Sequence, residues 1–410
     1  MLKAKKILIN GLNFSPEIVG IGKYTTELVE YLHENDCNVN VICACPYFPE
    51  WRTEKNIYSI EKKKDFYKIY RCPIYLPKKI NGFNRILHLL SFYLSSFPII
   101  LFQYFWKPDV IITIVPSFFS TQNSLFLSFL MRFKVTTLVH YQDLEIDAAF
   151  EMGILKNKFL KKIIYLWERI TLSKFDYISS ISENMIKKLS RKNLDKKKLY
   201  YLPNWVDTKQ IFPHFITNNS YKKQFNIPEN KIIFVYSGSM NQKQGVEILA
   251  ELATYDFNNK NIFWIFAGEG PSKKILLEKT KNKKNVLITT LQPPERMNEW
   301  LNLADVHIIP QKDEASDLVL PSKLITILAS GKPFIVTTSP KTQLGKIAAD
   351  AGILVFPYSN FYGLVDAVEK LANDDSLRKK LGKKARDLAI QKYDKEEVLC
   401  NFLKFIQSLN

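Results

Sequence analysis

The sequence predicts an α/β protein made of two doubly wound, Rossmann-like halves. With 410 residues the chain is too long for one ordinary hydrophobic core. The order strand, glycine-bearing loop, amphipathic helix, strand occurs at the start and again after residue 230. We place the halves at residues 1–205 and 206–391, facing each other across a cleft, with a C-terminal helix over 392–410 that returns to the first half.

The first half opens with a buried strand over 6–10, an amphipathic helix over 23–32 and a second strand over 39–44. Gly20 and Gly22 come directly before the helix, where the absence of a Cβ lets the backbone approach a ligand. The run GIGKYT lacks the third glycine of dinucleotide-binding loops, which argues against a nicotinamide site. A bare glycine turn remains the alternative.

An uncharged segment of the first half, residues 86–106, is long enough to cross a bilayer. Crossing would put the strands expected over 67–72 and 110–115 on opposite sides of a membrane, although both belong to one sheet. Pro98 and the interior polar residues instead favour a broken helix that is buried or lies at a membrane interface. The residue on each flank is basic, which suits an anionic lipid surface.

A strand expected over 135–139 ends at the sequence HYQDLEID. We therefore expect His140 and Asp143 in a loop at the ligand-binding edge of the sheet, where they could act in acid–base chemistry. The spacing of Asp143, Glu145 and Asp147 could also hold a metal ion. Because no second acidic cluster matches it, a solvated loop with one structural carboxylate is the favoured alternative to a metal site.

The stretch 306–337 is predicted to form a strand, a polar loop, a short helix and a further strand. Ser322 is expected to cap the helix start and Gly331 to end the helix. The unpaired N–H groups of a helix start attract phosphate, and Lys323 adds a positive charge there. An ordinary capped helix with a solvated lysine is the alternative for this stretch taken alone.

The chain carries a formal net charge of +18, with 30 Lys and Arg against 18 Asp and Glu in residues 1–200. Such an excess predicts an anionic partner: nucleic acid, an acidic membrane or a phosphorylated ligand. Nucleic acid is disfavoured because the lysines scatter over helices instead of alternating with exposed aromatic residues. Five cysteines without a CxxC pair, and a start without signal-peptide features, lead us to expect a cytoplasmic location.

Several motifs follow one another along nearly the whole chain: NGLNFSPEIVGIGKYTTELVEYL, CPYFPEW, YRCPIYLPK, HYQDLEIDA, LPNWVD, YSGSMNQKQG, AGEGP and LPSKLITILASGKP. In this order the chain resembles the family 4 glycosyltransferases of the GT-B fold, in particular those of colanic-acid type that build bacterial surface polysaccharides. The resemblance implies a nucleotide-sugar donor held by the second half and an acceptor held by the first. It also implies transfer with retention at the anomeric carbon, without a metal or a cofactor.

The resemblance further implies the site residues. Gly20 and Gly22 match the glycine loop that approaches the donor diphosphate, and His140 and Asp143 match the loop that faces the sugar. The matching donor positions of the second half are Gly238, Lys243, Gly268, Gly270, Leu291, Pro321, Ser322 and Lys323. Of these, Lys243 is expected to meet the phosphates, and the backbone of Leu291 to read the base.

The chain departs from the family pattern at one place. Many members carry two glutamates eight residues apart, and the matching positions here hold Leu318 and Thr326. Recognition of the ribose, and with it the identity of the nucleotide, is therefore open. Asp317 lies one residue from the first position and Glu314 four, and Asp317 is our hypothesis for the replacement contact.

We expect a lipid-linked saccharide acceptor and attachment to the anionic inner face of the cell membrane. The first half holds most of the charge excess and also the apolar segment 86–106. An epimerase or a hydrolase acting on nucleotide sugars with the same fold is the alternative enzyme. Product analysis separates the two, because an epimerase changes the donor without any acceptor.

Overall fold

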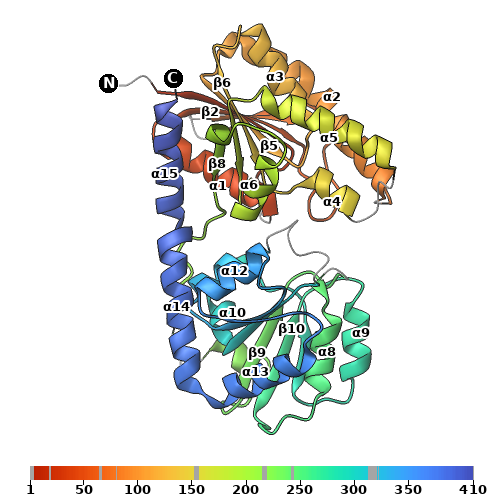
Figure 1. Cartoon of the computed structure of the whole chain (residues 1–410), viewed down its shortest axis with the longest axis vertical. Helices are drawn as coiled ribbons and strands as arrows, with labels where there is room; N and C mark the ends of the chain where they lie inside the picture. Colours follow the sequence, from red (N-terminus) through yellow and green to blue (C-terminus); the bar gives the residue numbers. More distant parts are fainter. Residues whose placement is uncertain are drawn as a thin grey trace. The chain divides into compact units, whose positions relative to one another are not determined.

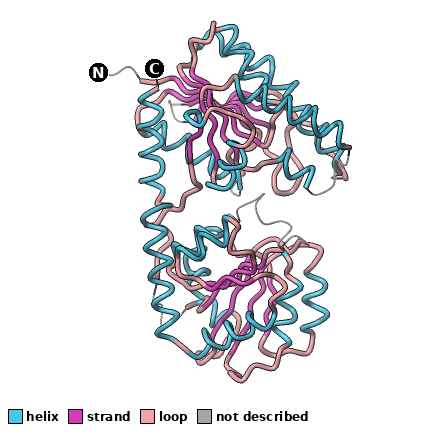
Figure 2. The backbone as a smooth tube through the Cα atoms, viewed as in Figure 1, coloured by secondary structure: helices cyan, strands magenta, loops and turns pink. Residues whose placement is uncertain are grey.

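The chain folds into two compact units, which are described separately. The computed structural model describes residues 4–17, 20–63, 67–79, 81–151, 157–214, 219–241, 244–312, 321 and 323–409. The N-terminal unit comprises Met1–Pro203 and Leu399–Asn410, and the C-terminal unit comprises Asn204–Val398. In each unit, helices cover both faces of a central sheet (Figures 1 and 2).

The N-terminal unit is built on an eight-stranded sheet with the strand order β3-β4-β2-β1-β5-β6-β7-β8. Its strands are β1 (Lys6–Gly11), β2 (Asn38–Ala44), β3 (Ser59–Lys63), β4 (Tyr67–Cys72), β5 (Val110–Val115), β6 (Thr136–Tyr141), β7 (Tyr177–Ser180) and β8 (Leu199–Tyr201). Its helices are α1 (Gly20–Glu34), α2 (Gly82–Trp106), α3 (Ser120–Leu130), α4 (Glu145–Glu151), α5 (Lys158–Ser173), α6 (Glu183–Ser190) and η2 (Lys196–Lys198). The helix α1 lies on one face of the sheet, and α2 and α3 lie together on the other (Figure 1).

The C-terminal unit is built on a six-stranded parallel sheet with the order β11-β10-β9-β12-β13-β14. Its strands are β9 (Ile232–Ser237), β10 (Ile262–Ala267), β11 (Val286–Thr289), β12 (Val306–Pro310), β13 (Phe334–Thr337) and β14 (Leu354–Phe356). Its helices are α7 (Ser220–Gln224), α8 (Glu247–Thr254), α9 (Lys273–Thr280), η4 (Pro294–Arg296), α10 (Met297–Leu303), α11 (Lys323–Ala329), α12 (Gln343–Asp350), α13 (Phe361–Asn373) and α14 (Asp375–Tyr393). The last helix of the chain, α15 (Lys395–Ser408), begins in this unit and ends in the N-terminal unit.

The central strands explain why the sequence reads as short unbroken apolar runs. Every residue of β5 and of β12 is buried. A parallel strand covered by helices on both faces has no solvent side, so polar and apolar residues do not alternate along it. After α11, the backbone of Gly331 takes the left-handed conformation (φ +65°) that glycine adopts without strain, and the helix ends there as expected.

Two expectations about the N-terminal unit were wrong. The strand β3 was not predicted, because its sequence SIEKK has no run of β-branched or aromatic residues, and its antiparallel pairing with β4 defines it instead. The expected break in the apolar segment is absent, since α2 runs through Pro98 without interruption. Proline removes one N–H donor and crowds the carbonyl four residues earlier, but Phe92 and Ile100 on either side of Pro98 are packed in the core.

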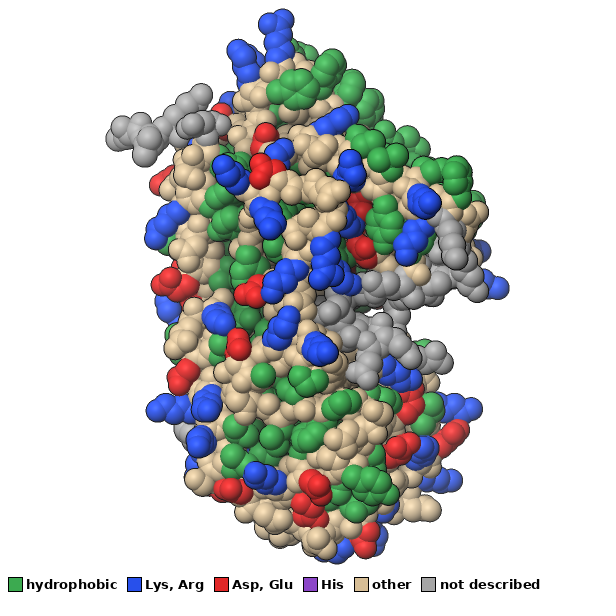
Figure 3. Space-filling model, in the orientation of Figure 1, with side chains coloured by type: hydrophobic (Ala, Val, Ile, Leu, Met, Phe, Trp, Pro, Cys, Tyr) green, Lys and Arg blue, Asp and Glu red, His purple; other side chains and the backbone are tan. Residues whose placement is uncertain are grey.

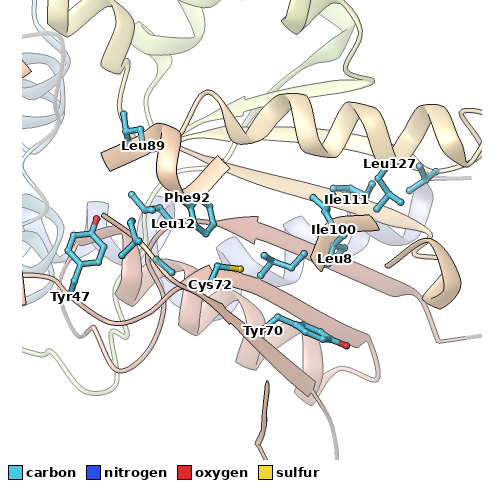
Figure 4. Close-up of a cluster of buried hydrophobic side chains, with 14 residues drawn as sticks. Leu8, Leu12, Tyr47, Tyr70, Cys72, Leu89, Phe92, Ile100, Ile111 and Leu127 are labelled. Carbon is cyan, nitrogen blue, oxygen red and sulfur yellow. The ribbon is translucent and has the colours of Figure 1, made fainter. Parts of the chain in front are cut away.

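The helix α2 is fixed to the sheet by its buried face. Leu89, Phe92 and Ile100 point toward a cluster that includes Leu8 and Ile111 of the central strands (Figure 4). The opposite face is exposed and apolar, with Phe83, Ile86, Leu94, Phe102, Tyr104 and Phe105. By length and composition alone α2 could cross a membrane, and in the described part of the chain it is the one helix of which this is true.

The end of α15 contacts the sheet of the N-terminal unit. Phe405 stacks on Tyr200 with ring centroids 4.2 Å apart and meets Tyr177 edge-on at 5.0 Å. These rings come from β7, β8 and the last turns of the chain, so residues about 200 positions apart in sequence form one cluster. Aromatic pairs of this geometry contribute beyond the area that they bury.

We expect Phe92→Ala to destabilise the chain by about 3–5 kcal/mol, because the ring is fully buried and its removal leaves a cavity. The matched change Phe105→Ala on the exposed face of the same helix should stay within about 0.5 kcal/mol. Urea unfolding followed by circular dichroism measures both. Equal losses in the two variants would contradict this orientation of α2.

Candidate functional site

Each sheet has one place where the order of its strands reverses. In the N-terminal unit the chain proceeds from β1 to β2 on one side, and β5 lies on the other side of β1. In the C-terminal unit the same reversal lies between β9 and β12. Connections leave such neighbouring strands in opposite directions, which opens a crevice at their carboxyl ends where open α/β sheets bind ligands. Apart from His140, which lies inside β6, the predicted site residues that the structure describes come after strands that end at these edges.

After β1, the predicted glycines lie in the first turn of α1, which begins at Gly20 and not, as expected, after Gly22. Gly20 has a φ of +58°, and among the described residues beyond its chain neighbours no atom lies within 4 Å of the position that a Cβ would take. At Gly22 a Cβ would lie 2.8 Å from the Cβ of Glu17. The carboxylate of Glu17 in turn accepts hydrogen bonds from the backbone N–H groups of Tyr47 and Phe48, at 3.1 and 3.0 Å. The open space beside Gly20 leaves the backbone there accessible to a ligand.

His140 lies in the strand β6 and not, as expected, in the loop after it, because it continues the parallel pairing with Ile114 and Ser179. The imidazole is buried and donates from Nδ1 to the Ser179 hydroxyl at 2.9 Å. The Gln142 amide donates to Nε2 at 3.1 Å. Burial lowers the pKa of His140 to about 3, so the ring is neutral at pH 7. In this arrangement His140 orients Gln142 and is a poor proton acceptor.

The loop after β6 carries carboxylates that meet cations. Glu145 pairs with Arg85 at 3.0 Å, and Asp147 pairs with Lys192 at 2.9 Å. Burial, with a smaller contribution from the charge of Asp143, raises the pKa of Glu145 to about 7 although Arg85 acts in the opposite direction. Two carboxylates of this loop are therefore held in ion pairs, whereas the sequence analysis favoured a solvated loop with one structural carboxylate. In the described residues, no group of three or more His, Cys, Asp and Glu side chains could hold a metal ion.

In the C-terminal unit, Lys323 reaches across the reversal from the connection after β12 to the end of β9. Its Nζ donates to the carbonyl oxygen of Ser237 at 3.1 Å and lies 3.9 Å from the ring centroid of Tyr236. A Cβ on Gly238 would lie 3.3 Å from the same Nζ. Burial lowers the pKa of Lys323 to about 7. The ammonium has no carboxylate partner in the described residues, so an anion bound beside it would stabilise its charged form.

The two glycine loops of this unit lie directly on each other. A Cβ on Gly268 would lie 1.9 Å from the carbonyl oxygen of Gly238, so only glycine fits there. The loops are joined by hydrogen bonds, including that from the Gly238 N–H to the carbonyl of Ala267 at 2.9 Å. Leu291 follows β11 at the same edge, and its side chain is 55% exposed. Lys323, Gly238 and Gly268 thus meet at one edge of one sheet.

The remaining predicted positions are only partly described. Pro321 lies before α11 and accepts a hydrogen bond from the N–H of Leu324 at 3.0 Å. The residues Lys243, Glu314, Asp317, Leu318 and Ser322 lie outside the described residues. Thr326, where many family members have glutamate, bonds its own helix by donating to the Lys323 carbonyl at 2.8 Å. The Thr326 side chain is therefore hydrogen-bonded within its own helix.

Sequence reasoning missed three residues of these edges. Tyr236 contacts Lys323, and Gln142 and Ser179 hold both nitrogens of His140. Tyr236 and Ser179 lie inside strands that read as ordinary buried strands, so no local pattern distinguishes them. Gln142 did have a signal, because it is a polar residue at the end of a buried strand. The neighbouring His140 and Asp143 have more reactive side chains, so the sequence analysis assigned the site to them and not to Gln142.

Two family models match the chain. The model for glycosyltransferase family 4 matches residues 18–210, and that for glycosyl transferases group 1 matches residues 217–388. A glycosyl transferase of Escherichia coli (strain K12), WcaI, is 33% identical over 98% of this chain and 100% of its own length. The chain belongs to glycosyltransferase family 4. The bacterial protein carries a name that assigns it to colanic acid biosynthesis.

Solved structures show which fold this family 4 glycosyltransferase adopts. A sucrose-phosphate synthase from Thermosynechococcus elongatus superposes with a TM-score of 0.75 at 15% identity, covering 99% of both chains. The Anabaena protein Alr3699/HepE, solved in complex with UDP-glucose, superposes with a TM-score of 0.69 at 10% identity over 98% of this chain and 100% of its own. The two parallel-sheet units are those of the GT-B fold, as the sequence predicted.

We expect Lys323→Met to stabilise the family 4 glycosyltransferase near pH 7, by about 1–2 kcal/mol, because it removes a partly buried charge that has no carboxylate partner among the described residues. The folded-state pKa lies below the unfolded one, so the cost of the lysine is complete below about pH 7 and disappears as the pH rises toward 10. Urea unfolding of both proteins at pH 6.5 and pH 9.5 measures the difference. A stability gain that does not shrink at pH 9.5 would contradict the lowered pKa.

Proposed function

We propose that the chain is a metal-independent, retaining glycosyltransferase that moves a sugar from a nucleotide-sugar donor to a lipid-linked saccharide in the synthesis of a bacterial surface polysaccharide. Lys323 beside Gly238 at the strand reversal is the observation that carries the proposal. The name of the Escherichia coli relative supports the pathway class, and the UDP-glucose complex of the Anabaena protein supports the donor class.

The donor diphosphate would bind at the edge of the C-terminal unit. The leaving group of the transfer is a nucleoside diphosphate, whose negative charge grows as the bond to the sugar breaks. A lysine with a lowered pKa and no carboxylate partner in the described residues becomes fully charged when phosphate approaches, and it then stabilises that leaving group. The glycine at 238 keeps a side chain away from the Lys323 ammonium, and the glycine at 268 lets its loop pack directly on Gly238. Lys243 is proposed as a second cation, as the family resemblance implies.

The acceptor hydroxyl would be oriented by the loop after β6. Asp143 is partly exposed at this edge, whereas His140 is buried behind Gln142. We assign orientation or polarisation of the hydroxyl to Asp143, and support of Gln142 to His140.

The acceptor is proposed to reach the enzyme from a membrane. The exposed face of α2 is apolar, and the N-terminal half of the chain holds most of the positive charge. Apolar side chains beside basic ones suit the interface of an anionic bilayer. We therefore propose a peripheral position on the inner face of the cell membrane. Flotation with anionic and neutral liposomes tests it, and equal recovery with both would contradict it.

The affinity for UDP is expected to fall as the pH rises from 7 to 9, by up to about tenfold per pH unit. The free Lys323 loses its proton in this range, whereas bound phosphate keeps it charged, so binding takes up a proton. Lys323→Met should bind UDP more weakly and lose this part of the pH dependence. The matched control Lys332→Met, another lysine whose pKa burial lowers, should bind as the wild type does. Isothermal titration calorimetry measures all three.

Asp143→Asn is expected to lower the turnover number about 100-fold or more while UDP binding stays unchanged, because its role concerns the acceptor. The exposed carboxylate Glu183 at the start of α6 supplies the control Glu183→Gln, which should keep normal turnover. Release of UDP from a donor sugar in the presence of acceptor measures the rates. Normal turnover in Asp143→Asn would exclude the assigned role.

A thermal-shift screen against UDP-, GDP- and CMP-sugars identifies the donor, because a ligand that binds the folded chain raises its melting temperature. Product analysis with the stabilising donor then tests the reaction. A sugar attached to an acceptor supports the proposal, whereas an altered donor sugar without acceptor indicates the epimerase alternative, and free sugar indicates a hydrolase.

A further inference from the structure

The N-terminal unit has a basic hollow that the proposed reaction does not use. A cavity of about 590 Å³ lies between α5 and α6. Of the side chains that the structure describes, one carboxylate, that of Asp147, and five cations line it: Lys162, Arg169, Lys188, Arg191 and Lys192. A concave surface with this excess of positive charge attracts and concentrates anions.

Three of these cations are available to a ligand. Lys192 is held by ion pairs with Asp147 and with the buried Glu168. In contrast, Lys162, Arg169 and Arg191 take part in none of the salt bridges formed among the described residues, and each is exposed to solvent. Guanidinium groups bind phosphate oxygens in pairs of parallel hydrogen bonds, and lysine adds a point charge. The hollow therefore suits a phosphate or diphosphate group.

The same helix carries an apolar stripe beside the hollow. The stripe consists of Phe159, Ile163, Leu166 and Ile170. These residues follow at intervals of three and four and so share one face of α5. A helix face of this kind normally lies against a core, but these side chains are between 47% and 72% exposed. Figure 3 shows hydrophobic side chains gathered at the upper right, over α2, α3 and α5, with Lys and Arg at the margin.

The hollow is connected to the loop to which we assign the acceptor. Asp147 on its wall follows Asp143 by four residues, so their Cα atoms are at most about 14 Å apart. The Tyr141 hydroxyl donates at 3.2 Å to Glu168, the carboxylate that holds Lys192. A molecule with its phosphate in the hollow could thus present an attached short glycan at Asp143.

We infer that this hollow binds the diphosphate head of the lipid that carries the acceptor, with the stripe of α5 in the adjoining bilayer surface. The inference rests on the proposed function for the identity of the glycan. Two features of the hollow favour a lipid diphosphate over bulk phospholipid as the ligand. The hollow concentrates several cations in one place, and it adjoins the acceptor loop.

The test compares three proteins for binding to vesicles. The pocket variant is Lys162→Gln with Arg169→Gln and Arg191→Gln. The control removes the same charge from exposed lysines elsewhere in the unit, with Lys62→Gln, Lys68→Gln and Lys134→Gln. Melting curves confirm that each variant is folded. Vesicles of phosphatidylcholine contain either a small fraction of polyprenyl diphosphate or phosphatidylglycerol at matched charge, and inorganic diphosphate serves as a soluble competitor.

Wild type and control should bind the polyprenyl diphosphate vesicles more tightly than the phosphatidylglycerol vesicles, and the pocket variant should lose about tenfold or more of that binding. Inorganic diphosphate should compete only weakly, because it lacks the membrane contact of the stripe. Equal binding of pocket variant and control overturns the inference. Equal binding of the wild type to both kinds of vesicle also overturns the inference and indicates binding to bulk phospholipid. Full displacement of the wild type by inorganic diphosphate overturns it as well and indicates a soluble phosphate ligand.

A stripe variant separates the two parts of the surface. Phe159→Ser with Ile163→Ser should weaken binding to every vesicle and leave the affinity for inorganic diphosphate unchanged. Vesicle binding involves no sugar transfer, so its outcome is independent of the reaction. A wild type that binds the lipid diphosphate but transfers no sugar refutes the proposed function alone. A wild type that transfers sugar, with a pocket variant that binds as tightly as the control, refutes this inference alone.

Discussion

The reversal of strand order beside β1 and beside β9 is the constraint on which the candidate site of each unit depends. Parallel strands end at the same edge of a sheet, and connections that leave in opposite directions keep that edge open. At β9 this brings a lysine from the connection after β12 to the carbonyl of Ser237. At β1 it leaves the turn at Gly20 uncovered, and two strands further along the sheet it places Asp143 on the same edge.

The chemistry of each edge follows from what burial does to charge. Lys323 loses water without gaining a carboxylate partner in the described residues, and its pKa falls to about 7. His140 loses water and gains two hydrogen bonds, so it stays neutral and holds its neighbour in place. A bound anion would therefore favour the charged form of Lys323, whereas His140 remains neutral, although both residues look like reactive side chains in the sequence. The proposed transfer assigns these residues different tasks, with Lys323 beside the leaving diphosphate and His140 in support of the acceptor loop.

Two helices on the surface of the N-terminal unit also differ in which apolar side chains they bury. The helix α2 buries one face and exposes the other, whereas the stripe of α5 is exposed although its spacing is that of a core face. The sequence shows the apolar segment 86–106 plainly, but it does not predict an exposed apolar face on α5. The lysines and short apolar intervals of α5 resemble those of an ordinary surface helix. Only the packing of Glu168 and Leu172 toward the sheet shows which face of α5 is left uncovered.

The sequence by itself determined the α/β class, the two halves, most strand positions and the glycines at the ends of strands. Periodicity and backbone freedom are local properties, and motif order identifies a family without any contact being known. The strand β3, the place of His140 inside β6 and the unbroken course of α2 were decided only by tertiary structure. So were the ring of Tyr236 beside Lys323 and the basic hollow between α5 and α6. Each depends on which distant segments meet, and the free energy of those contacts is absent from any local stretch of the chain.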